Sequence, residues 1–336
     1  MIAKRALLYA AGGGIGDSLL ATVVARALRD KYEAVDALTL SSHRETLMRV
    51  PDLNEVLVDE GEERDVAAVL RARAYDAAVV TWATARTARI PQLARIPLRV
   101  GQSRRLYSHR FNRRVAVRSE LGDVTSHWTD ILLDYARAIG CDTSDTAPVF
   151  VPTSDDESAA ATLIQRLTDG NAFAILHPAN AEATRREVQW PTRAWSSLAL
   201  ALSERAGVRV LISGSDADRE IASRIAQDGD AIAIAGETPI GVFGALARRA
   251  RVFAGITTGT MHVAAAVGAP TVGVFPFQTD TPERWAPHGP RTAVVRATYP
   301  CRTGERKETC PDYACIANLD IPRIIASVQQ MTAVLS

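Results

Sequence analysis

Small hydroxyl residues and a glycine stand where a predicted strand gives way to a predicted helix in the second half of the chain. The segment 257–262 reads Thr-Thr-Gly-Thr-Met-His and follows the short apolar run 252–254. The first turn of a helix carries unpaired backbone N–H groups and the positive end of the helix dipole. The segment therefore suits a phosphate or pyrophosphate, with an ordinary threonine-capped helix start as the alternative.

A carboxylate stands at a similar junction near the beginning of the chain. The strand predicted at 5–10 is followed by the glycine-rich turn 12–16 and then by Asp17, where the helical pattern 18–29 begins. The glycine spacing fits a dinucleotide-binding loop only in part, and a carboxylate at this place would repel a pyrophosphate. Asp17 is therefore predicted to be either a general base or a plain helix cap.

Residues 99–118 form a basic stretch in the first half. The stretch holds seven arginines and no acidic residue, with Tyr107, His109 and Phe111 between them. Because arginine forks match phosphate oxygens, it could hold a phosphorylated acceptor or an anionic lipid head group. A solvated basic loop is the alternative. Nucleic acid is a poor candidate, because the rest of the chain is not basic.

These residues must be positioned by alternating strands and helices. In the first half, further strands are predicted at 37–40, 55–58, 77–80 and 115–117. Helices are predicted between them and after them at 45–50, 65–74 and 129–139, and turns at Pro91 and Pro97. In the second half, strands are predicted at 172–176, 208–212, 231–234, 252–254 and 271–275, and helices at 157–167, 242–251 and 322–335. Such alternation predicts helix-covered parallel sheets.

A polar, proline-bearing segment at 143–156 is predicted to link two halves. We expect an α/β protein with Rossmann-like domains at 1–150 and 151–336, whose parallel sheets face a cleft between them. The pattern leaves open whether the last helix packs on the first domain. His177 ends a predicted strand and Asn180 follows it, so both are expected to face the cleft.

The chain has 336 residues, of which 47% are hydrophobic, and a net charge of +1. These values predict a globular protein without overall attraction for nucleic acid or membrane. No apolar run could span a bilayer, residues 2–9 are too short and too charged for a signal peptide, and four cysteines do not indicate a disulfide-stapled secreted fold. We expect a cytoplasmic protein, with peripheral contact at the inner face of the plasma membrane left open.

Six motifs in register resemble glycosyltransferase family 9, the ADP-heptose:lipopolysaccharide heptosyltransferases and their relatives. They are the segment 14–20, His177-Pro178, Trp190-Pro191 with Trp195, the segment 213–216, Thr258-Gly259-x-x-His262 and the segment 264–275. The resemblance implies a GT-B fold, with acceptor bound by the first domain and nucleotide-sugar donor by the second. It implies an inverting transfer without metal or other cofactor, with heptose from ADP-heptose as the expected donor. The expected acceptor is a phosphorylated glycan or glycolipid, such as a lipopolysaccharide core.

The same resemblance implies roles for single residues. Asp17 matches the family's general base, which deprotonates the acceptor hydroxyl. The residues expected at the donor are His177, Asn180, Arg186, Ser213, Gly214, Thr257, Thr258, Gly259, Thr260 and His262. The residues expected at the acceptor are Gly14, Gly16, Arg104, Arg105, Arg110 and Arg113.

Two positions depart from the family pattern. Val188 stands where many members carry a lysine that contacts the donor phosphate, and Thr257 where a sugar-contacting aspartate is common. Arg185, Arg186 or Arg193 could supply the cation that Val188 lacks. The departures leave open a transferase or epimerase that uses another nucleotide sugar, or a catalytically silent nucleotide-sugar-binding protein.

The cysteines and the remaining histidines are not expected to hold a metal. Cys301, Cys310 and Cys315 are separated by eight and four residues and form an incomplete ligand set, so a reduced or disulfide-linked loop is preferred. The other histidines are expected at the surface or at helix ends: His43, His109, His127 and His288.

Overall fold

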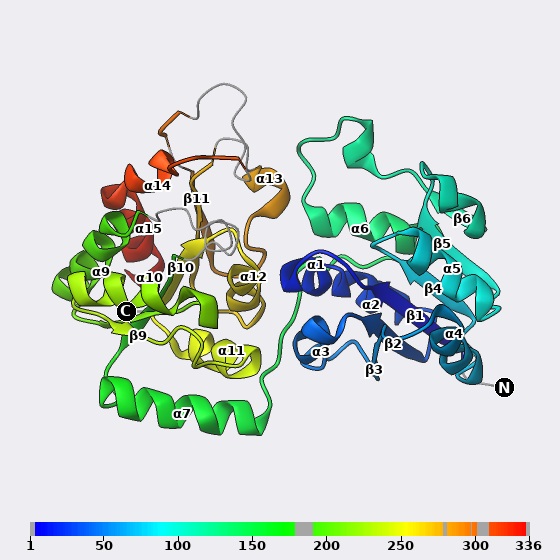
Figure 1. Cartoon of the computed structure of the whole chain (residues 1–336), viewed down its shortest axis with the longest axis horizontal. Coiled ribbons are helices and arrows are strands. Elements are labelled where there is room, and N and C mark those ends of the chain that lie inside the picture. The colour runs from blue at the N-terminus through cyan, green and yellow to red at the C-terminus, as the bar shows by residue number, and fades with distance from the viewer. Residues whose placement is uncertain (1–3, 179–190, 278–280, 297, 301–308, 334–336) are drawn as a thin grey trace. The chain divides into compact units, whose positions relative to one another are not determined.

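The computed structural model describes residues 4–178, 191–277, 281–296, 298–300 and 309–333 (Figure 1). The chain divides into two compact units, Met1–Val151 and Pro152–Ser336. Each unit is a parallel sheet with helices on both faces. The predicted α/β class is therefore confirmed.

Among the described residues, the first sheet has six strands in the order β3-β2-β1-β4-β5-β6. The strands are β1 (Arg5–Ala10), β2 (Ala34–Thr39), β3 (Val56–Val58), β4 (Ala77–Val80), β5 (Leu98–Gln102) and β6 (Arg113–Val115). The α-helices are α1 (Ile15–Leu20), α2 (Thr22–Leu28), α3 (Ser41–Leu47), α4 (Glu63–Ala72), α5 (Ala85–Leu93) and α6 (Trp128–Arg137). Two 3₁₀ turns are η1 (Leu106–Arg110) and η2 (Arg118–Leu121). This is the strand order of a Rossmann fold, in which the direction of the crossovers switches between β1 and β4.

The described part of the second sheet also has six strands, in the order β12-β11-β10-β7-β8-β9. They are β7 (Phe173–His177), β8 (Arg209–Ile212), β9 (Ile232–Ala233), β10 (Val252–Ile256), β11 (Thr271–Phe275) and β12 (Thr292–Arg296). The helices are α7 (Ser154–Thr168), α9 (Arg193–Ala206), η3 (Asp216–Asp218), α10 (Arg219–Asp228), α11 (Ile240–Arg249), α12 (Gly259–Ala266), α13 (Pro282–Trp285), α14 (Ala314–Ala317) and α15 (Ile321–Ala333). The connectivity repeats that of the first sheet, so the switch lies between β7 and β10.

The central strands are apolar because both faces of each sheet are covered. In the first unit, Leu7 and Tyr9 of β1 pack with the apolar side chains of α4 and α5. The other face is covered by α2 and α6, which contact each other. In the second unit, Trp195 of α9 is fully buried in a core to which α15 contributes Ile324 and Val328. The last helix is therefore part of the core of the second unit.

Two strands and one helical proline differ from the sequence prediction. β5 carries Arg99, whose guanidinium donates to the carbonyls of Ile96 and Arg110, so a charged residue fits a sheet that is otherwise apolar. β12 lies at the edge of its sheet, which weakens the apolar pattern. The predicted turn at Pro91 is wrong, because this residue lies in the last turns of α5, where its missing N–H removes a single helix bond.

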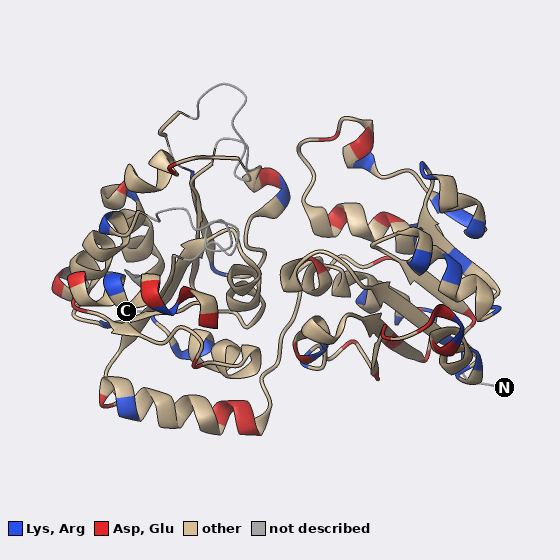
Figure 2. Cartoon of the chain, viewed as in Figure 1, with Lys and Arg blue, Asp and Glu red and all other residues tan. Residues whose placement is uncertain are grey.

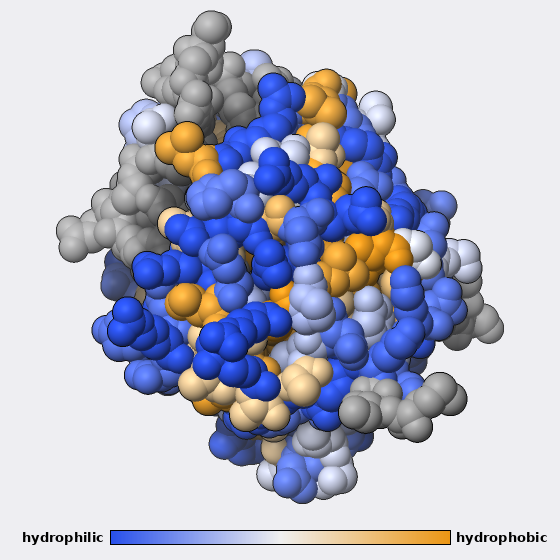
Figure 3. Space-filling view, turned by 90° about the vertical axis from the view of Figure 1, so that its right-hand side faces the viewer, coloured by the Kyte–Doolittle hydropathy of each residue, from blue (hydrophilic) through white to orange (hydrophobic). Residues whose placement is uncertain are grey.

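In the described parts of the chain, no helix is both long enough and apolar enough to cross a bilayer. The face of the molecule in Figure 3 is mostly hydrophilic, with small apolar areas between polar side chains.

Candidate functional site

Asp17 lies in the first turn of α1, directly after the glycine-rich turn at the end of β1. Its Oδ2 atom accepts a hydrogen bond of 2.8 Å from the backbone N–H of Gly14, the residue that caps the helix. Gly13 has a φ of +66°, and a Cβ at this residue would lie 2.4 Å from Oδ2. Glycine is therefore required at 13 both by the backbone and by the carboxylate. The turn holds a half-buried carboxylate in one orientation.

Asp17 borders a small hollow at the carboxyl ends of β1 and β4. Two tryptophans line this hollow: Trp82, just after β4, and Trp128, the first residue of α6. The remaining lining residues are small or aliphatic apart from two hydroxyls: Ala10, Gly12, Ser18, Ala21, Thr81 and Leu132. The hollow lies at the topological switch point, the place where α/β sheets usually bind ligands.

A histidine that the sequence pattern placed at the surface or at a helix end is buried behind Asp17. His43 lies in the first turn of α3 and is only 4% exposed. Its Nδ1 lies 2.8 Å from the hydroxyl of Ser18, which itself donates to the carbonyl of Ala10. We therefore assign the shared proton to Nδ1. Burial lowers the pKa of His43, and the charge of Asp17 opposes this effect. His43 therefore lies at a helix end, one of its two expected positions, but it is buried rather than at the surface, because α3 packs against α1.

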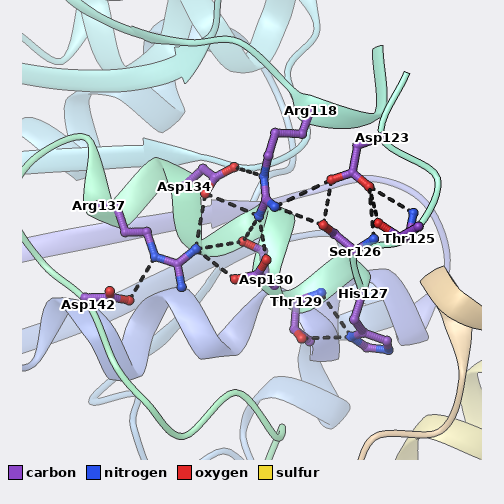
Figure 4. A network of polar contacts seen from close by, with 10 residues as sticks. All are labelled: Arg118, Asp123, Thr125, Ser126, His127, Thr129, Asp130, Asp134, Arg137 and Asp142. Atoms are coloured by element: carbon purple, nitrogen blue, oxygen red, sulfur yellow. Dashed lines mark hydrogen bonds and ion pairs between the residues drawn. The ribbon is translucent and has the colours of Figure 1, made fainter. Parts of the chain in front are cut away.

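An ion-pair network holds the segment that leads to Trp128 (Figure 4). Arg118 contacts the carboxylates of Asp130 and Asp134 at 2.6 Å each, and Arg137 contacts the same two carboxylates at 2.8 and 3.2 Å. Burial opposes ionisation of Asp130, but hydrogen bonds from both arginines lower its pKa below the ordinary value. The network thus ties the segment after β6 to the exposed side of α6.

The start of α6 is capped by a second polar group. The ring of His127 accepts a hydrogen bond of 3.3 Å from the backbone N–H of Thr129, and its Nδ1 lies 2.8 Å from the Thr129 hydroxyl. His127 therefore lies at a helix end, as predicted. Together with the ion pairs, this cap fixes the position of Trp128.

The four arginines predicted to bind acceptor do not share one environment. Figure 2 shows basic residues on several elements of the first unit. Arg104 and Arg105 follow the carboxyl end of β5, and Arg105 forms an ion pair with Glu120. Arg110 donates to Gln92 near the end of α5, and Arg113 begins β6. Within the described residues, no hydrogen bond or ion pair engages the guanidinium of Arg104 or Arg113. The predicted glycines lie beside Asp17: Gly14 caps α1 and Gly16 is buried within it.

The second unit presents its own junction at the end of β10. Thr258 is the cap residue of α12, but its side chain does not bond to the first-turn N–H groups. Its hydroxyl lies 2.8 Å from that of Thr260 and 3.4 Å from the carbonyl of Ile256. Residues 257–260 are half-buried, and His262 is 7% exposed. The start of α12 therefore offers hydroxyl and backbone donors in a sheltered place.

His177 ends β7 beside this junction, in register with Gly255 of β10. Burial lowers its pKa to about 4, against the opposing charge of Asp218, so the imidazole is neutral at pH 7. Its Nδ1 lies 3.0 Å from the hydroxyl of Ser213, which donates to the carbonyl of Leu176. With the Ser213 proton used in this way, Nδ1 carries the imidazole proton and Nε2 is an acceptor. The structure thus brings together His177, Ser213 and the end of β10.

Gly214 follows Ser213, and a Cβ there would lie 2.8 Å from the Cβ of Asp218. Asn180, Arg186 and Cys301 lie outside the described residues. Cys310 and Cys315 are buried, and the former accepts a hydrogen bond from the backbone of Tyr313. Within the part of the chain that the structure describes, no three metal-ligating side chains are grouped to hold an ion.

The model of glycosyltransferase family 9 (heptosyltransferase) matches residues 64–314. No protein of curated function is a significant match. Among solved structures, E. coli ADP-heptose lipopolysaccharide heptosyltransferase II is similar, with 21% identity, a TM-score of 0.79 and coverage of 99% of each chain. A family 9 glycosyltransferase from Veillonella parvula DSM 2008 has 17% identity and a TM-score of 0.81, covering 98% of this chain and 97% of that one.

E. coli heptosyltransferase WaaC with ADP is a third similar structure, with 18% identity, a TM-score of 0.71 and coverage of 97% of this chain and 99% of that one. These likenesses show the fold, two Rossmann-like units of the GT-B class. The family match spans more than half of the sequence. The chain therefore belongs to glycosyltransferase family 9, the heptosyltransferase family, and is a glycosyltransferase.

Proposed function

We propose that the protein transfers heptose from ADP-heptose to a hydroxyl of a lipopolysaccharide-core-like or other glycan acceptor, with inversion at the anomeric carbon. One observation carries this proposal beyond family membership. A half-buried carboxylate, Asp17, is held by the Gly14 N–H at the switch point of the first sheet, beside a small hollow. Two solved structures of E. coli heptosyltransferase WaaC, which are similar to this chain, contain ADP and ADP-2-deoxy-2-fluoro heptose.

Asp17 acts as the general base of the proposed reaction. As the acceptor oxygen forms its bond to the anomeric carbon, its proton passes to the carboxylate of Asp17. The bond from the anomeric carbon to the phosphate oxygen breaks on the opposite face, and the nucleoside diphosphate leaves. The hydrogen bond from the Gly14 N–H to Oδ2 holds the carboxylate in place.

The second unit stabilises the leaving diphosphate in this proposal. Thr257, Thr258 and Thr260 supply hydroxyls, and the N–H groups at the start of α12 face the developing charge. His177 is neutral, so its Nε2 accepts a hydrogen bond from a donor hydroxyl or amine and adds no positive charge. Ser213, Gly214 and His262 complete the proposed donor site, to which Asn180 and Arg186 remain assigned as predictions. No metal takes part in the proposed transfer.

The acceptor half of the proposal rests on the first unit. The backbone of Gly14 and Gly16 places the acceptor beside Asp17. Arg104 follows the carboxyl end of β5, where a phosphate substituent of the acceptor can approach it. A glycolipid acceptor would place the protein peripherally at a membrane, which stays a prediction.

The Asp17→Asn variant tests the proposed base, with Asp65→Asn as the matched control. Both aspartates are the third residue of a helix, α1 or α4. We expect Asp17→Asn to lower heptose transfer at least about 100-fold, the range for loss of a general base. The control should keep wild-type turnover. ADP release and transferred heptose are measured by chromatography, and ADP-heptose binding by thermal shift.

Near-normal transfer by Asp17→Asn would exclude the assigned role. Interconversion of the donor sugar without acceptor would instead favour an epimerase. Donor binding without transfer to any glycan would favour a silent binding protein.

A further inference from the structure

Trp82 is a large apolar side chain that remains partly exposed beside the proposed base. It is 41% exposed, although it follows a fully buried strand, and it lines the same hollow as Asp17. Trp128 lines the hollow from the first turn of α6. An exposed indole in a hollow is usually a contact for a ligand rather than for the core.

The glycine at position 12 is explained by the indole. A Cβ on Gly12 would lie 1.9 Å from Cδ1 and 2.2 Å from Cγ of Trp82. Gly12 does not have a positive φ, so its backbone does not require glycine. The ring therefore lies directly against the turn that carries Asp17, and only glycine leaves room for it. The turn therefore needs glycine at 12 to make room for the indole of Trp82 and at 13 to make room for the carboxylate of Asp17.

Both tryptophans are carried by a rigid backbone. The carbonyl of Trp82 accepts a hydrogen bond of 2.9 Å from the hydroxyl of Thr87, and the N–H of Thr81 donates to the carbonyl of Tyr9 at 3.1 Å. Trp128 follows the capping residue His127 and the ion-pair network of Arg118. The backbone that carries each indole is thus held in place before a ligand arrives, which reduces the entropy lost on binding.

We propose that Trp82 and Trp128 form the subsite for the acceptor sugar ring that bears the reacting hydroxyl. This inference rests on the proposed function and names the chemistry of its acceptor subsite. The hollow has a volume of about 10 Å³, which admits a hydroxyl but not a sugar ring. A pyranose has an apolar C–H face and a rim of hydroxyls, so the face stacks on the exposed indole of Trp82 at the mouth of the hollow while one hydroxyl enters it and reaches Asp17. The carboxylate of Asp17 lines the hollow, and no arginine is among the described residues that line it, so the subsite selects an uncharged ring and phosphate groups on the acceptor lie outside it.

The first test measures transfer of heptose from ADP-heptose to a lipopolysaccharide-core oligosaccharide. Trp82→Ala should raise the acceptor KM about tenfold, the scale of an aromatic contact, and leave the KM for ADP-heptose unchanged. Trp82→Phe keeps an aromatic face and should restore most of the affinity. Val69→Ala, at a 46% exposed apolar residue of α4, is the control and should match the wild type.

A double-mutant cycle separates the indole contact from a general disturbance of the turn. Gly12→Ala should raise the acceptor KM in the wild-type background, because the new methyl displaces the ring. In the Trp82→Ala background it should add nothing, because the group it displaces is gone. Additive effects of the two substitutions would overturn the proposed contact.

The oligosaccharide is then compared before and after phosphatase treatment. Equal fold-changes for Trp82→Ala on both forms support a subsite for the uncharged ring, whereas a change confined to the phosphorylated form contradicts it. An unchanged acceptor KM in Trp82→Ala, with transfer intact, overturns the subsite alone. Absence of transfer by the wild-type protein overturns the proposed function and the subsite with it.

Discussion

Substitution of Gly13 by alanine should damage the reaction more than the fold. At this residue two costs coincide, because φ is +66° and the new Cβ would lie 2.4 Å from Oδ2 of Asp17. Gly61 provides a matched comparison in the same unit. Its φ is +84°, and nothing lies within 4 Å of an added Cβ. Gly61→Ala therefore carries only the backbone cost.

The two costs have different sizes and different consequences. A left-handed conformation costs an L-residue other than glycine about 1–2 kcal/mol, so both variants should lose about that much free energy of unfolding. At Gly13 the contact of 2.4 Å must open to more than 3 Å, so the carboxylate moves by an appreciable fraction of an ångström. A displacement on the order of 1 Å at a reacting group can lower a rate about 100-fold. We expect that loss in Gly13→Ala and not in Gly61→Ala.

Urea unfolding measures the loss of stability, and steady-state heptose transfer measures the loss of rate, on the same preparations of both variants. The expected result is a similar fall in the urea midpoint for both variants, with a large fall in kcat for Gly13→Ala alone. If Gly13→Ala keeps the kcat of Gly61→Ala, the position of the Asp17 carboxylate does not control the reaction, and the reasoning from the turn is refuted.

Two further predictions concern pH and the ion-pair network. The pKa of His177 falls from 6.5 to about 4 on folding, so the unfolded chain binds a proton first as the pH decreases. The free energy of unfolding should therefore fall as the pH decreases from 6.5 to 4, by at most about 3 kcal/mol. In His177→Gln, urea unfolding at a series of pH values should show no such contribution from residue 177. Arg118→Met should lower the free energy of unfolding by about 1 kcal/mol, measured by urea unfolding, because it removes the ion pairs of Arg118. It should also raise the acceptor KM, because the segment before Trp128 is then held less firmly. Arg224→Met, which removes an exposed pair on α10, should change neither by a measurable amount.

Most of the fold follows from local pattern. Strands buried on both faces leave uninterrupted apolar runs, and runs such as 77–80 and 271–275 coincide with β4 and β11. The pattern fails where a strand has a polar or exposed side. In β5, Arg99 satisfies its guanidinium with carbonyls that only the folded chain brings near. No local signal predicts such a pair.

The sequence predicts the site only where the residue types within a single turn indicate a chemical role. Asp17 stands out because a carboxylate is unusual after a glycine-rich strand end. Trp82 and His43 carry no such signal, since a tryptophan after a strand or a histidine in a helix is ordinary. Their significance comes from the switch point, which brings the end of β4 and the start of α3 to the turn after β1. The fit of Trp82 to Gly12 could have been suspected only from an otherwise unexplained glycine.

In the proposed function, the two units use one connectivity for opposite chemical tasks. In the first, the N–H of Gly14 at the start of α1 donates to the carboxylate of Asp17, so a group that would attract an anion instead orients the proposed base. In the second, the Thr258 side chain makes no bond to the first turn of α12, and its hydroxyl lies near that of Thr260 and a strand carbonyl. The proposed phosphate site uses the helix dipole at this end of α12. In the proposed function, a proton acceptor follows β1 and an anion site follows β10, two strands that border the switch points of their sheets. The difference depends on whether a side chain accepts hydrogen bonds from the backbone N–H groups at the start of the next helix.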